Sequence, residues 1–207
     1  MYMRRTIITT AMLCMVMVAA AQEVQPLPKP DKKAKMTLFQ ALDRRESVRD
    51  YSDREIPERT LSNLLWAACG INRPGQGRIT APSAINAQDI TVYVCRQDGA
   101  WKYDAAAHAL TKVSDKDLRK QVAGFQDFAA TAPVSLVLVS DISKVRNHSE
   151  LGAMDAGYVS ENICLACTAL GLATVPRATM DKAELAKELK LSDSEVLMLN
   201  NPVGYKK

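Results

Sequence analysis

The chain carries Arg44-Arg45-Glu46-Ser47-Val48-Arg49-Asp50-Tyr51 and, further along, Ala81-Pro82-Ser83-Ala84-Ile85-Asn86-Ala87-Gln88. The first stretch places up to three guanidinium groups and a hydroxyl within six positions. Guanidinium is planar and permanently charged, so arginines clustered with a serine suit the oxygens of a phosphate. The second stretch is a turn-rich loop whose Asn and Gln amides both donate and accept hydrogen bonds, which suits the edge of a heterocyclic ring. Together they indicate a site for a nucleotide-like cofactor; the alternative is a solvated helix end with a polar loop behind it.

The spacing of apolar residues predicts an α+β fold. Between Pro57 and Gly70, apolar residues recur at i, i+3, i+4 and i+7, which predicts a helix. From 90 to 113 the period changes to two, with a turn at Asp98-Gly99, which is typical of a strand meander. Helices and strands that do not alternate regularly favour an α+β arrangement. We expect helices at 38–43, 57–69, 151–170 and 181–189, one more ending at 123 after a cap from Ser114 and Asp117, strands at 90–95, 101–103, 109–113, 134–139 and 196–199, and a loop at 72–87.

The N-terminus has the pattern of an export signal. A short basic start precedes a mostly apolar run at 7–18, and Ala19-Ala20-Ala21 fits the small-x-small cleavage rule before Gln22. The run is too short to span a bilayer comfortably. We therefore expect a cleavable secretory signal at 1–21, a Pro- and Lys-rich extended tether at 22–36 and one folded domain at 37–207, with the mature protein exported to the periplasm. The alternative is an uncleaved anchor.

Size and charge favour a single domain that acts on a small molecule. The 207 residues are 47% hydrophobic and 24% charged, which is enough for one globular domain with an adequate core. Cleavage of the signal would remove two arginines and no acid, which leaves 25 basic and 23 acidic residues and lowers the formal charge from +4 to +2. Such a balance favours neither nucleic acid nor an anionic membrane as the partner.

The cysteines and histidines do not indicate a metal or redox centre. Cys164 and Cys167 lie within one predicted helix, whereas a redox pair normally stands at a helix N-terminus, where the dipole lowers the thiol pKa. In mid-helix they are more often small core residues, although the even number of cysteines in an exported chain also allows disulfides. His108 and His148 are not paired with cysteines or acids at metal-ligand spacing, and the motifs Gly-x-Ser-x-Gly, P-loop and Gly-x-Gly-x-x-Gly are absent from the sequence.

Four motifs, in this order, resemble those of the nitroreductase family of FMN-dependent oxidoreductases. Arg-x-Ser-x-Arg-x-aromatic stands at Arg45–Tyr51, and Pro-Ser-x-x-Asn-x-Gln stands at Pro82–Gln88. Ala-Leu-Gly-Leu followed by a proline stands at Ala169–Pro176, and a Gly-aromatic-basic ending stands at Gly204–Lys207. Any one motif is weak, but four in the right order are specific, and the resemblance runs from about Leu38 to the C-terminus.

This resemblance implies a fold and a cofactor. The fold is a mixed, largely antiparallel sheet flanked by helices, in a homodimer whose interface includes the helix at 151–170. The alternative for that helix is an ordinary place in the core. The implied cofactor is FMN, and because hydride transfer at the flavin N5 is the cofactor's own chemistry, no catalytic side chain is expected.

The resemblance also implies which residues hold FMN. Arg45 and Ser47 contact the ribityl phosphate, on either side of Glu46. Arg49 reaches the flavin N1 and C2 carbonyl, where a fixed cation stabilises the negative charge that accumulates on reduction. The other implied residues are Pro82, Ser83, Ala84 and Asn86 over the ring, typically from the partner subunit; Pro176, Arg177 and Ala178 along the N5 edge, offering it a backbone N–H; and Lys206 and Lys207 as second phosphate contacts or, alternatively, a frayed tail.

The chain departs from the family pattern at three places. Glu46 stands where members often carry Arg or His, so we expect its side chain to point away from the phosphate, with Arg44 substituting. Ala178-Thr179 stands where many members carry Glu-Gly or Gly-Gly, and the chain ends soon after Tyr205 without the extension that wraps the partner in larger members. These departures leave the substrate class and the details of the dimer open.

The reaction implied by the resemblance passes hydride or electrons from NAD(P)H through FMN to a nitroaromatic, quinone or similar small acceptor. Free nicotinamide cofactors are scarce outside the cytoplasm, so the export signal suggests another reductant, such as a redox partner or a membrane quinol. Two alternatives are an FMN dehydrogenase acting on peptide azolines, which the export signal disfavours, and a non-catalytic exported flavin-binding protein.

Overall fold

The computed structural model describes residues 22–33 and 35–207, so the predicted export signal at 1–21 lies outside the described residues. Over this part of the chain the domain is built on one seven-stranded sheet whose pairings are all antiparallel, which confirms the α+β expectation. Its strands are Val24–Pro26 (β1), Ile90–Arg96 (β4), Gly99–Asp104 (β5), Ala109–Ser114 (β6), Val134–Asp141 (β7), Ala173–Thr174 (β8) and Glu195–Gly204 (β9), in the spatial order β1-β6-β5-β4-β7-β9-β8.

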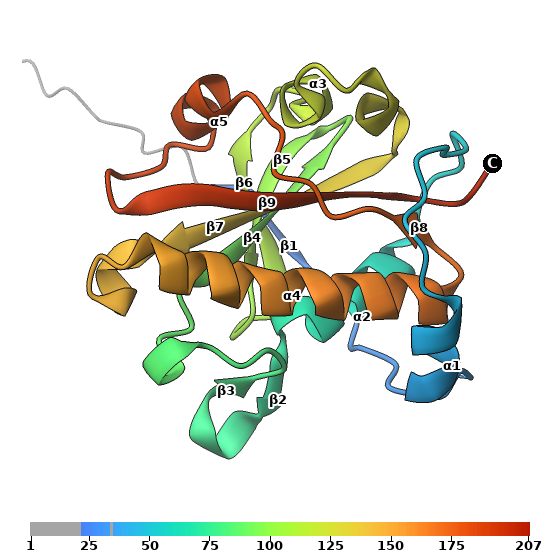
Figure 1. Ribbon diagram of the computed structural model, residues 1–207, viewed down its shortest axis with the longest axis horizontal. Helices are drawn as coiled ribbons and strands as arrows, with labels where there is room; N and C mark the ends of the chain where they lie inside the picture. Colours follow the sequence, from blue (N-terminus) through green and yellow to red (C-terminus); the bar gives the residue numbers. More distant parts are fainter. Residues whose placement is uncertain (1–21, 34) are drawn as a thin grey trace, which may run out of the picture.

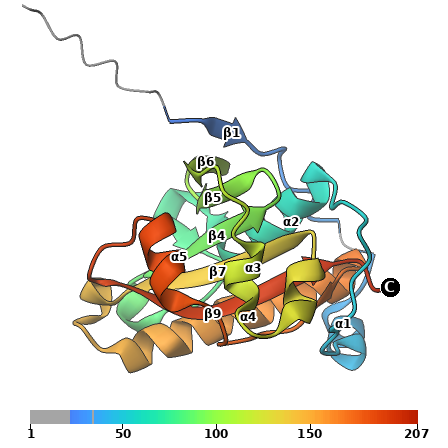
Figure 2. The ribbon, with the colours of Figure 1, turned by 90° about the horizontal axis from the view of Figure 1, so that it is seen from above.

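Helices cover both faces of this sheet. Ser149–Leu170 (α4) crosses one face beside Glu58–Cys69 (α2), and Leu38–Arg44 (α1) lies at the end of α4 (Figure 1). Arg119–Ala123 (α3) and Lys182–Glu188 (α5) lie on the opposite face (Figure 2). Each face has its own buried apolar cluster, one with side chains of α2 and α4 and the other with side chains of α3 and α5.

The long helix α4 follows the apolar pattern that predicts it. Gly152 lets the helix approach β7 closely, because an added Cβ would collide with the side chain of Ser140. Gly171 ends the helix in the left-handed conformation, with φ of 70°. The residues that α4 buries recur at helical spacing: Gly152, Asp155, Ala156, Val159, Ser160, Ile163, Cys164 and Cys167.

Two parts of the predicted pattern need correction. Ser114 does not cap a helix, because pairing with β5 makes it the last residue of β6, and α3 begins only at Arg119. Asp117 still serves at the start of α3, where its carboxylate accepts the Arg119 N–H at 3.1 Å. The predicted loop at 72–87 contains a short hairpin of Ile71–Arg73 (β2) with Arg78–Ile79 (β3), which was too short to show a period of two.

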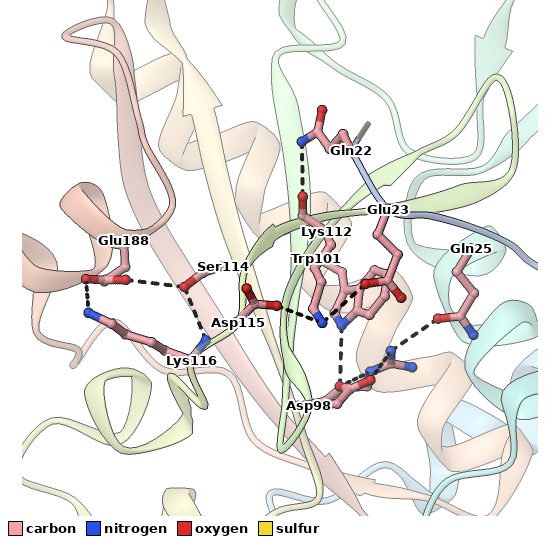
Figure 3. A network of polar contacts seen from close by, with 11 residues as sticks. Gln22, Glu23, Gln25, Asp98, Trp101, Lys112, Ser114, Asp115, Lys116 and Glu188 are labelled. Carbon is pink, nitrogen blue, oxygen red and sulfur yellow. Dashed lines mark hydrogen bonds and ion pairs between the residues drawn. The ribbon is translucent and has the colours of Figure 1, made fainter. Parts of the chain in front are cut away.

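The segment predicted to be a tether is part of the sheet. β1 pairs with β6 and forms one edge of the sheet (Figure 2). Polar side chains reinforce the pairing: Gln22 donates to the Lys112 carbonyl at 3.0 Å, and Glu23 lies 3.3 Å from the Lys112 ammonium (Figure 3). Arg96 of β4 donates to the Gln25 amide oxygen at 3.2 Å. The strand has three residues, one of them a proline, and these carried too little alternation to predict it from the sequence.

A buried polar cluster fixes the chain just after β1. The Pro28 carbonyl accepts hydrogen bonds from the hydroxyl of Ser62 and, at 3.2 Å, from Nε2 of His108. The other ring nitrogen of His108 lies 2.9 Å from the hydroxyl of Tyr103. Burial lowers the pKa of His108, which favours the neutral ring at neutral pH. His108 thus joins the N-terminal segment to α2 and β5.

Replacing His108 with Ala tests this attachment. Loss of its hydrogen bonds should lower the free energy of unfolding by about 1–2 kcal/mol. It should also speed tryptic cleavage after Lys32 and Lys33, because the segment is released. His148→Ala is the matched control, since that exposed ring contacts the Glu150 carboxylate on the surface. Urea unfolding and limited proteolysis measure both effects, and equal cleavage rates in the two variants would contradict the attachment.

Candidate functional site

The stretch with the predicted phosphate contacts runs extended between α1 and the end of the chain. The backbone leaves the helix at Arg45, with φ of −60° and ψ of 121°. The Val48 N–H donates to the Thr174 carbonyl at 3.0 Å, and the Ser52 N–H donates to the Tyr205 carbonyl at 2.9 Å. Segments far apart in sequence therefore meet here, and α1, β8 and the C-terminus gather at one end of the molecule (Figure 1).

This stretch presents polar side chains to solvent. Val48 is buried, whereas Ser47 and Arg49 are exposed and Arg45 is half-buried. Arg45, Ser47 and Arg49 alternate with Glu46 and Val48 along the stretch. Within residues 22–33 and 35–207, no hydrogen bond or ion pair engages these three side chains. Two positive charges and a hydroxyl thus remain available to an anion.

Tyr51, the aromatic residue of the first motif, anchors the stretch. Its hydroxyl donates to the Val48 carbonyl at 2.7 Å, and its ring belongs to a buried cluster with Val48, Ala132 and Ala173. Gly204 leaves room for the ring, because an added Cβ would lie 3.2 Å from a Tyr51 ring carbon. Burial raises the pKa of Tyr51, so the phenol stays neutral. The motif therefore combines exposed polar residues with a buried anchor.

Glu46 is neutralised by the C-terminus. Lys206 Nζ lies 2.7 Å from Glu46 Oε1, and this contact lowers the pKa of the Glu46 carboxyl through a hydrogen bond and through charge. The Glu46 side chain is thus paired with Lys206, and the expectation that Arg44 substitutes in the phosphate site stays a prediction. Lys207 donates its backbone N–H to the Asp50 carbonyl at 3.3 Å. Lys206 and the backbone of Lys207 thus lie beside the Arg45–Arg49 stretch, and their predicted phosphate contacts stay a prediction.

Arg177 has a structural role that the sequence did not predict. Its buried guanidinium donates to the carbonyls of Val122 at 3.2 Å and Ala123 at 2.7 Å, and to the side-chain oxygen of Asn200 at 2.8 Å. These carbonyls belong to the last turn of α3, where the helix dipole leaves partial negative charge that a cation stabilises. The side chain therefore joins α3 to β9 and faces away from solvent.

The backbone hydrogen bonds of Arg177 limit which of the three predicted residues can offer an N–H to the flavin N5 edge. The Arg177 N–H donates to the Asn200 carbonyl at 2.8 Å, and the Arg177 carbonyl accepts the Asn200 N–H at 2.7 Å. Proline has no N–H, so Pro176 cannot donate. Of the three predicted residues, Ala178 is the one left to offer this donor. Pro176 and Ala178 are both exposed, on either side of buried Arg177.

Two buried asparagines that the sequence analysis did not single out hold this end together. Asn200 donates its side-chain amide to the Thr179 carbonyl at 3.0 Å. Asn201 accepts a hydrogen bond from the hydroxyl of Ser160 at 2.9 Å, and this bond joins β9 to α4. The sequence did contain a signal for this role, which is the pair of adjacent amides in a largely apolar closing strand. Buried polar side chains require hydrogen-bond partners, so the pair indicates contacts with other elements.

In the folded chain, the loop with the predicted ring contacts lies apart from the Arg45–Arg49 stretch. The Ala84 N–H donates to the Asp155 carboxylate, in the first half of α4. Arg45, by contrast, lies near Cys164, in the second half of α4, where its charge partly offsets the rise that burial causes in the pKa of that thiol. Asp155 and Cys164 are nine positions apart on the helix, a distance of about 13 Å at the helical rise. One chain therefore brings together Arg45–Arg49, Pro176–Ala178 and Lys206–Lys207, and leaves Pro82–Asn86 towards the opposite end of α4 (Figure 1).

The cysteines are core residues, as the mid-helix spacing predicts. The four in the described part of the chain are buried and unpaired: Cys69, Cys95, Cys164 and Cys167. Burial raises the pKa of Cys69 and Cys95 to about 12 and that of Cys164 to about 11, which disfavours the reactive thiolate. Residues 22–33 and 35–207 contain no cluster of three His, Cys, Asp or Glu residues that could hold a metal, and no helix there is long and apolar enough to cross a membrane.

Comparison with known proteins places this geometry in a family. The antiparallel sheet with a long helix across one face defines an α+β domain. A sequence model of the nitroreductase family matches residues 42–205, and the chain belongs to this family.

Relatives support the assignment. The chain is 30% identical over 183 residues to a protein of Methanocaldococcus jannaschii named as a nitroreductase, covering 82% of this chain and 91% of that protein. A crystal structure from Ralstonia eutropha JMP134, also named as a nitroreductase, has a TM-score of 0.83 at 34% identity and covers 89% of this chain and 90% of that chain. The Bacillus subtilis protein named FMN reductase, NAD(P)H, is 25% identical over 159 residues, which are 67% of this chain and 53% of that protein.

Replacing Arg177 with Lys separates a structural role from cofactor binding. Lysine keeps the charge but lacks the fork that reaches two carbonyls and Asn200 together. The free energy of unfolding should fall by about 2–4 kcal/mol, because buried acceptors lose their donors. The control is Arg59→Lys on the exposed side of α2, which should stay within about 0.5 kcal/mol. Urea unfolding measures both, and an Arg177→Lys variant of unchanged stability would contradict the structural role.

Proposed function

We propose that the protein is an exported, homodimeric FMN-dependent oxidoreductase. In this proposal it passes hydride or electrons from a reduced donor to a nitroaromatic, quinone or similar small acceptor. The observation that carries the proposal is the group of Arg45, Ser47 and Arg49. Ser47 and Arg49 are exposed, Arg45 is half-buried, and within the described residues no hydrogen bond or ion pair engages the three side chains. The name of the Bacillus subtilis relative, an FMN reductase, supports both FMN and a nicotinamide donor.

The side chains present fit the phosphate of FMN. A phosphate needs fixed cations and hydroxyl or amide donors, and Arg45 and Ser47 are side chains of these two kinds. The acid between them would repel a phosphate, but the Lys206 ammonium, 2.7 Å from Glu46, compensates its charge. Lys206 therefore acts on the phosphate site through Glu46, and Lys207 adds a further cation beside it.

The remaining contacts fit the flavin ring. We assign Arg49 to the N1 and C2 edge, where a fixed cation stabilises negative charge. We assign the Ala178 N–H to the N5 edge, because the Arg177 N–H is already bonded to Asn200. FMN supplies hydride and electron transfer when bound, so the side chains bind and orient it and none is assigned a catalytic role.

The site needs a second copy of the chain to be complete. On α4, which crosses the foreground of Figure 1, Met154 and Tyr158 are 57% and 48% exposed. On α1, Phe39 is 81% exposed. Exposed apolar residues on adjacent helices are typical of a protein interface. We infer that two copies pack through α4 and that the Pro82–Asn86 loop of one copy covers the ring held by Arg45–Arg49 of the other.

The electron donor depends on the compartment. The Bacillus subtilis name supports NAD(P)H as a chemically competent donor. The basic start, apolar run and Ala19-Ala20-Ala21 cleavage pattern support export, which would deprive the enzyme of free nicotinamide cofactors. We therefore propose that the physiological reductant is a redox partner or a membrane quinol.

The visible spectrum of the mature chain from Gln22 tests the function. The protein should take up FMN and turn yellow, and a good donor should bleach it under anaerobic conditions. Arg49→Ala should slow this reduction by about tenfold or more, because the stabilising cation is lost, whereas Arg59→Ala should not. Bleaching by dithionite but not by NADPH would support a different donor. A protein that takes up no FMN would overturn the proposal.

Replacing Gly157 with Glu tests the dimer. An added Cβ at Gly157 meets no atom within 4 Å, so the single chain accommodates a side chain there. At an α4 interface, however, the variant would bury an unpaired charge, which is costly. We expect a monomer by analytical ultracentrifugation and FMN affinity weaker by about tenfold or more, since the loop of the partner is lost. Gly75→Glu is the control, because an added Cβ there is equally unobstructed. A dimeric Gly157→Glu protein would contradict the α4 interface.

A further inference from the structure

The loop predicted to cover the ring holds a strained backbone. Ile85, Asn86 and Gln88 have φ angles of 47°, 58° and 47°, in the left-handed region that a β-branched residue such as Ile strongly avoids. Ser83 supplies part of the support, since its hydroxyl accepts the Gln88 N–H at 2.9 Å and its carbonyl accepts the Asn86 N–H at 3.0 Å. Strain of this kind persists only where the surroundings impose it, so the loop needs an anchor in the rest of the fold.

Asp155 of α4 is that anchor. Its two carboxylate oxygens lie 3.0 and 2.9 Å from the backbone nitrogen of Ala84 and share its N–H. The side chain is 1% exposed, so the bond is shielded from competing water. Ala84 directly precedes Ile85, which places the bond where the left-handed turn begins.

A second buried acid stands behind the first. Asp89, which ends the loop, is fully buried and lies close enough to Asp155 to contribute to the raised pKa of that carboxyl. The Ser140 hydroxyl of β7 donates to one Asp89 oxygen, and Gly152 of α4 leaves the space that Ser140 occupies. The other Asp89 oxygen has no hydrogen-bond partner among the described residues.

The nearby Asp89 carboxyl also acts on Asp155. Burial, and then contact with Asp89, raise the pKa of Asp155 to about 6, while the Ala84 N–H acts in the opposite direction. Asp155 therefore faces a backbone donor on one side and a second carboxyl on the other, and its position is defined from both sides.

Core stability alone does not account for this pair. Buried acids lose their hydration, and apolar side chains of similar size would pack the same space at least as well. α4 uses such side chains one and two turns further on, at Val159 and Ile163. The pair stands instead beneath the strained loop, where its hydrogen bond sets the backbone geometry.

We propose that Asp155, supported by Asp89 and Ser140, is a positioning residue that sets the conformation of the Ser83–Gln88 loop. Through the loop, Asp155 also shapes the part of the cofactor site that the loop contributes to the partner subunit. The second step rests on the proposed function, whereas the first can be measured in protein without cofactor.

Two variants of Asp155 test the inference. Asp155→Ala removes both oxygens, whereas Asp155→Asn keeps one oxygen for the Ala84 N–H and offers its amide to the Asp89 carboxylate. Glu150→Ala, an exposed acid on the same helix, is the control. If the alanine variant is insoluble, Asp155→Ser replaces it, because its hydroxyl is too short to reach Ala84. The measurements are amide hydrogen exchange of the 82–88 segment without cofactor, and the dissociation constant of FMN.

In the alanine variant, exchange in the 82–88 segment should be about tenfold faster or more, because the loop opens locally. FMN should also bind about tenfold more weakly or worse. The asparagine variant and Glu150→Ala should stay within about threefold of the parent in both measurements. A loop that exchanges equally in the parent and alanine variants would overturn the inference. So would a freed loop with unchanged FMN affinity. A parent protein that binds no FMN, but whose loop is freed by the alanine variant, would overturn the proposed function and support the loop anchor.

Discussion

This end of the molecule depends on the hydrogen bonds along the edge of β9 that faces away from β7. One edge of β9 pairs with β7 along nearly its whole length. The other edge is shared by short pieces: β8 pairs near Val203, Arg177 bridges to Asn200, and just past the strand Lys206 bridges to Tyr51. Backbone donors and acceptors buried along this edge all require partners. Those partners are the segments that carry the proposed cofactor contacts.

The arginines at this end have opposite environments despite equal charge. Arg177 is buried, and its guanidinium donates to carbonyls at the end of α3 and to Asn200, so it holds α3 against β9. Arg45 and Arg49 lie on a stretch held by backbone bonds and by Tyr51, so their side chains need no structural partners. A site built this way is preorganised, because binding an anion does not require breaking existing ion pairs.

Local patterns in the sequence predicted much of the fold. The helices at α1, α2, α4 and α5 and the main strands followed apolar spacing, since each buries one face. β1 was missed because it has three residues and its partner, β6, lies far along the chain. The role of Arg177 was missed for a similar reason: its acceptors come from α3 and β9, and no local pattern records them. The Glu46–Lys206 contact likewise joins residues 160 positions apart, which only the fold brings together.

The N-terminal strand also bears on solubility. An unpaired strand edge offers a row of donors and acceptors to any other chain, which promotes aggregation. β1 covers the β6 edge, and its outer side is interrupted by Pro26, with Pro28 and Pro30 close behind. Proline cannot donate to a further strand. At the opposite edge, β8 has two residues, too few to template an addition. Both margins of the sheet are thus poor templates for aggregation, and a chain shortened past Pro30 would lose that protection on one side.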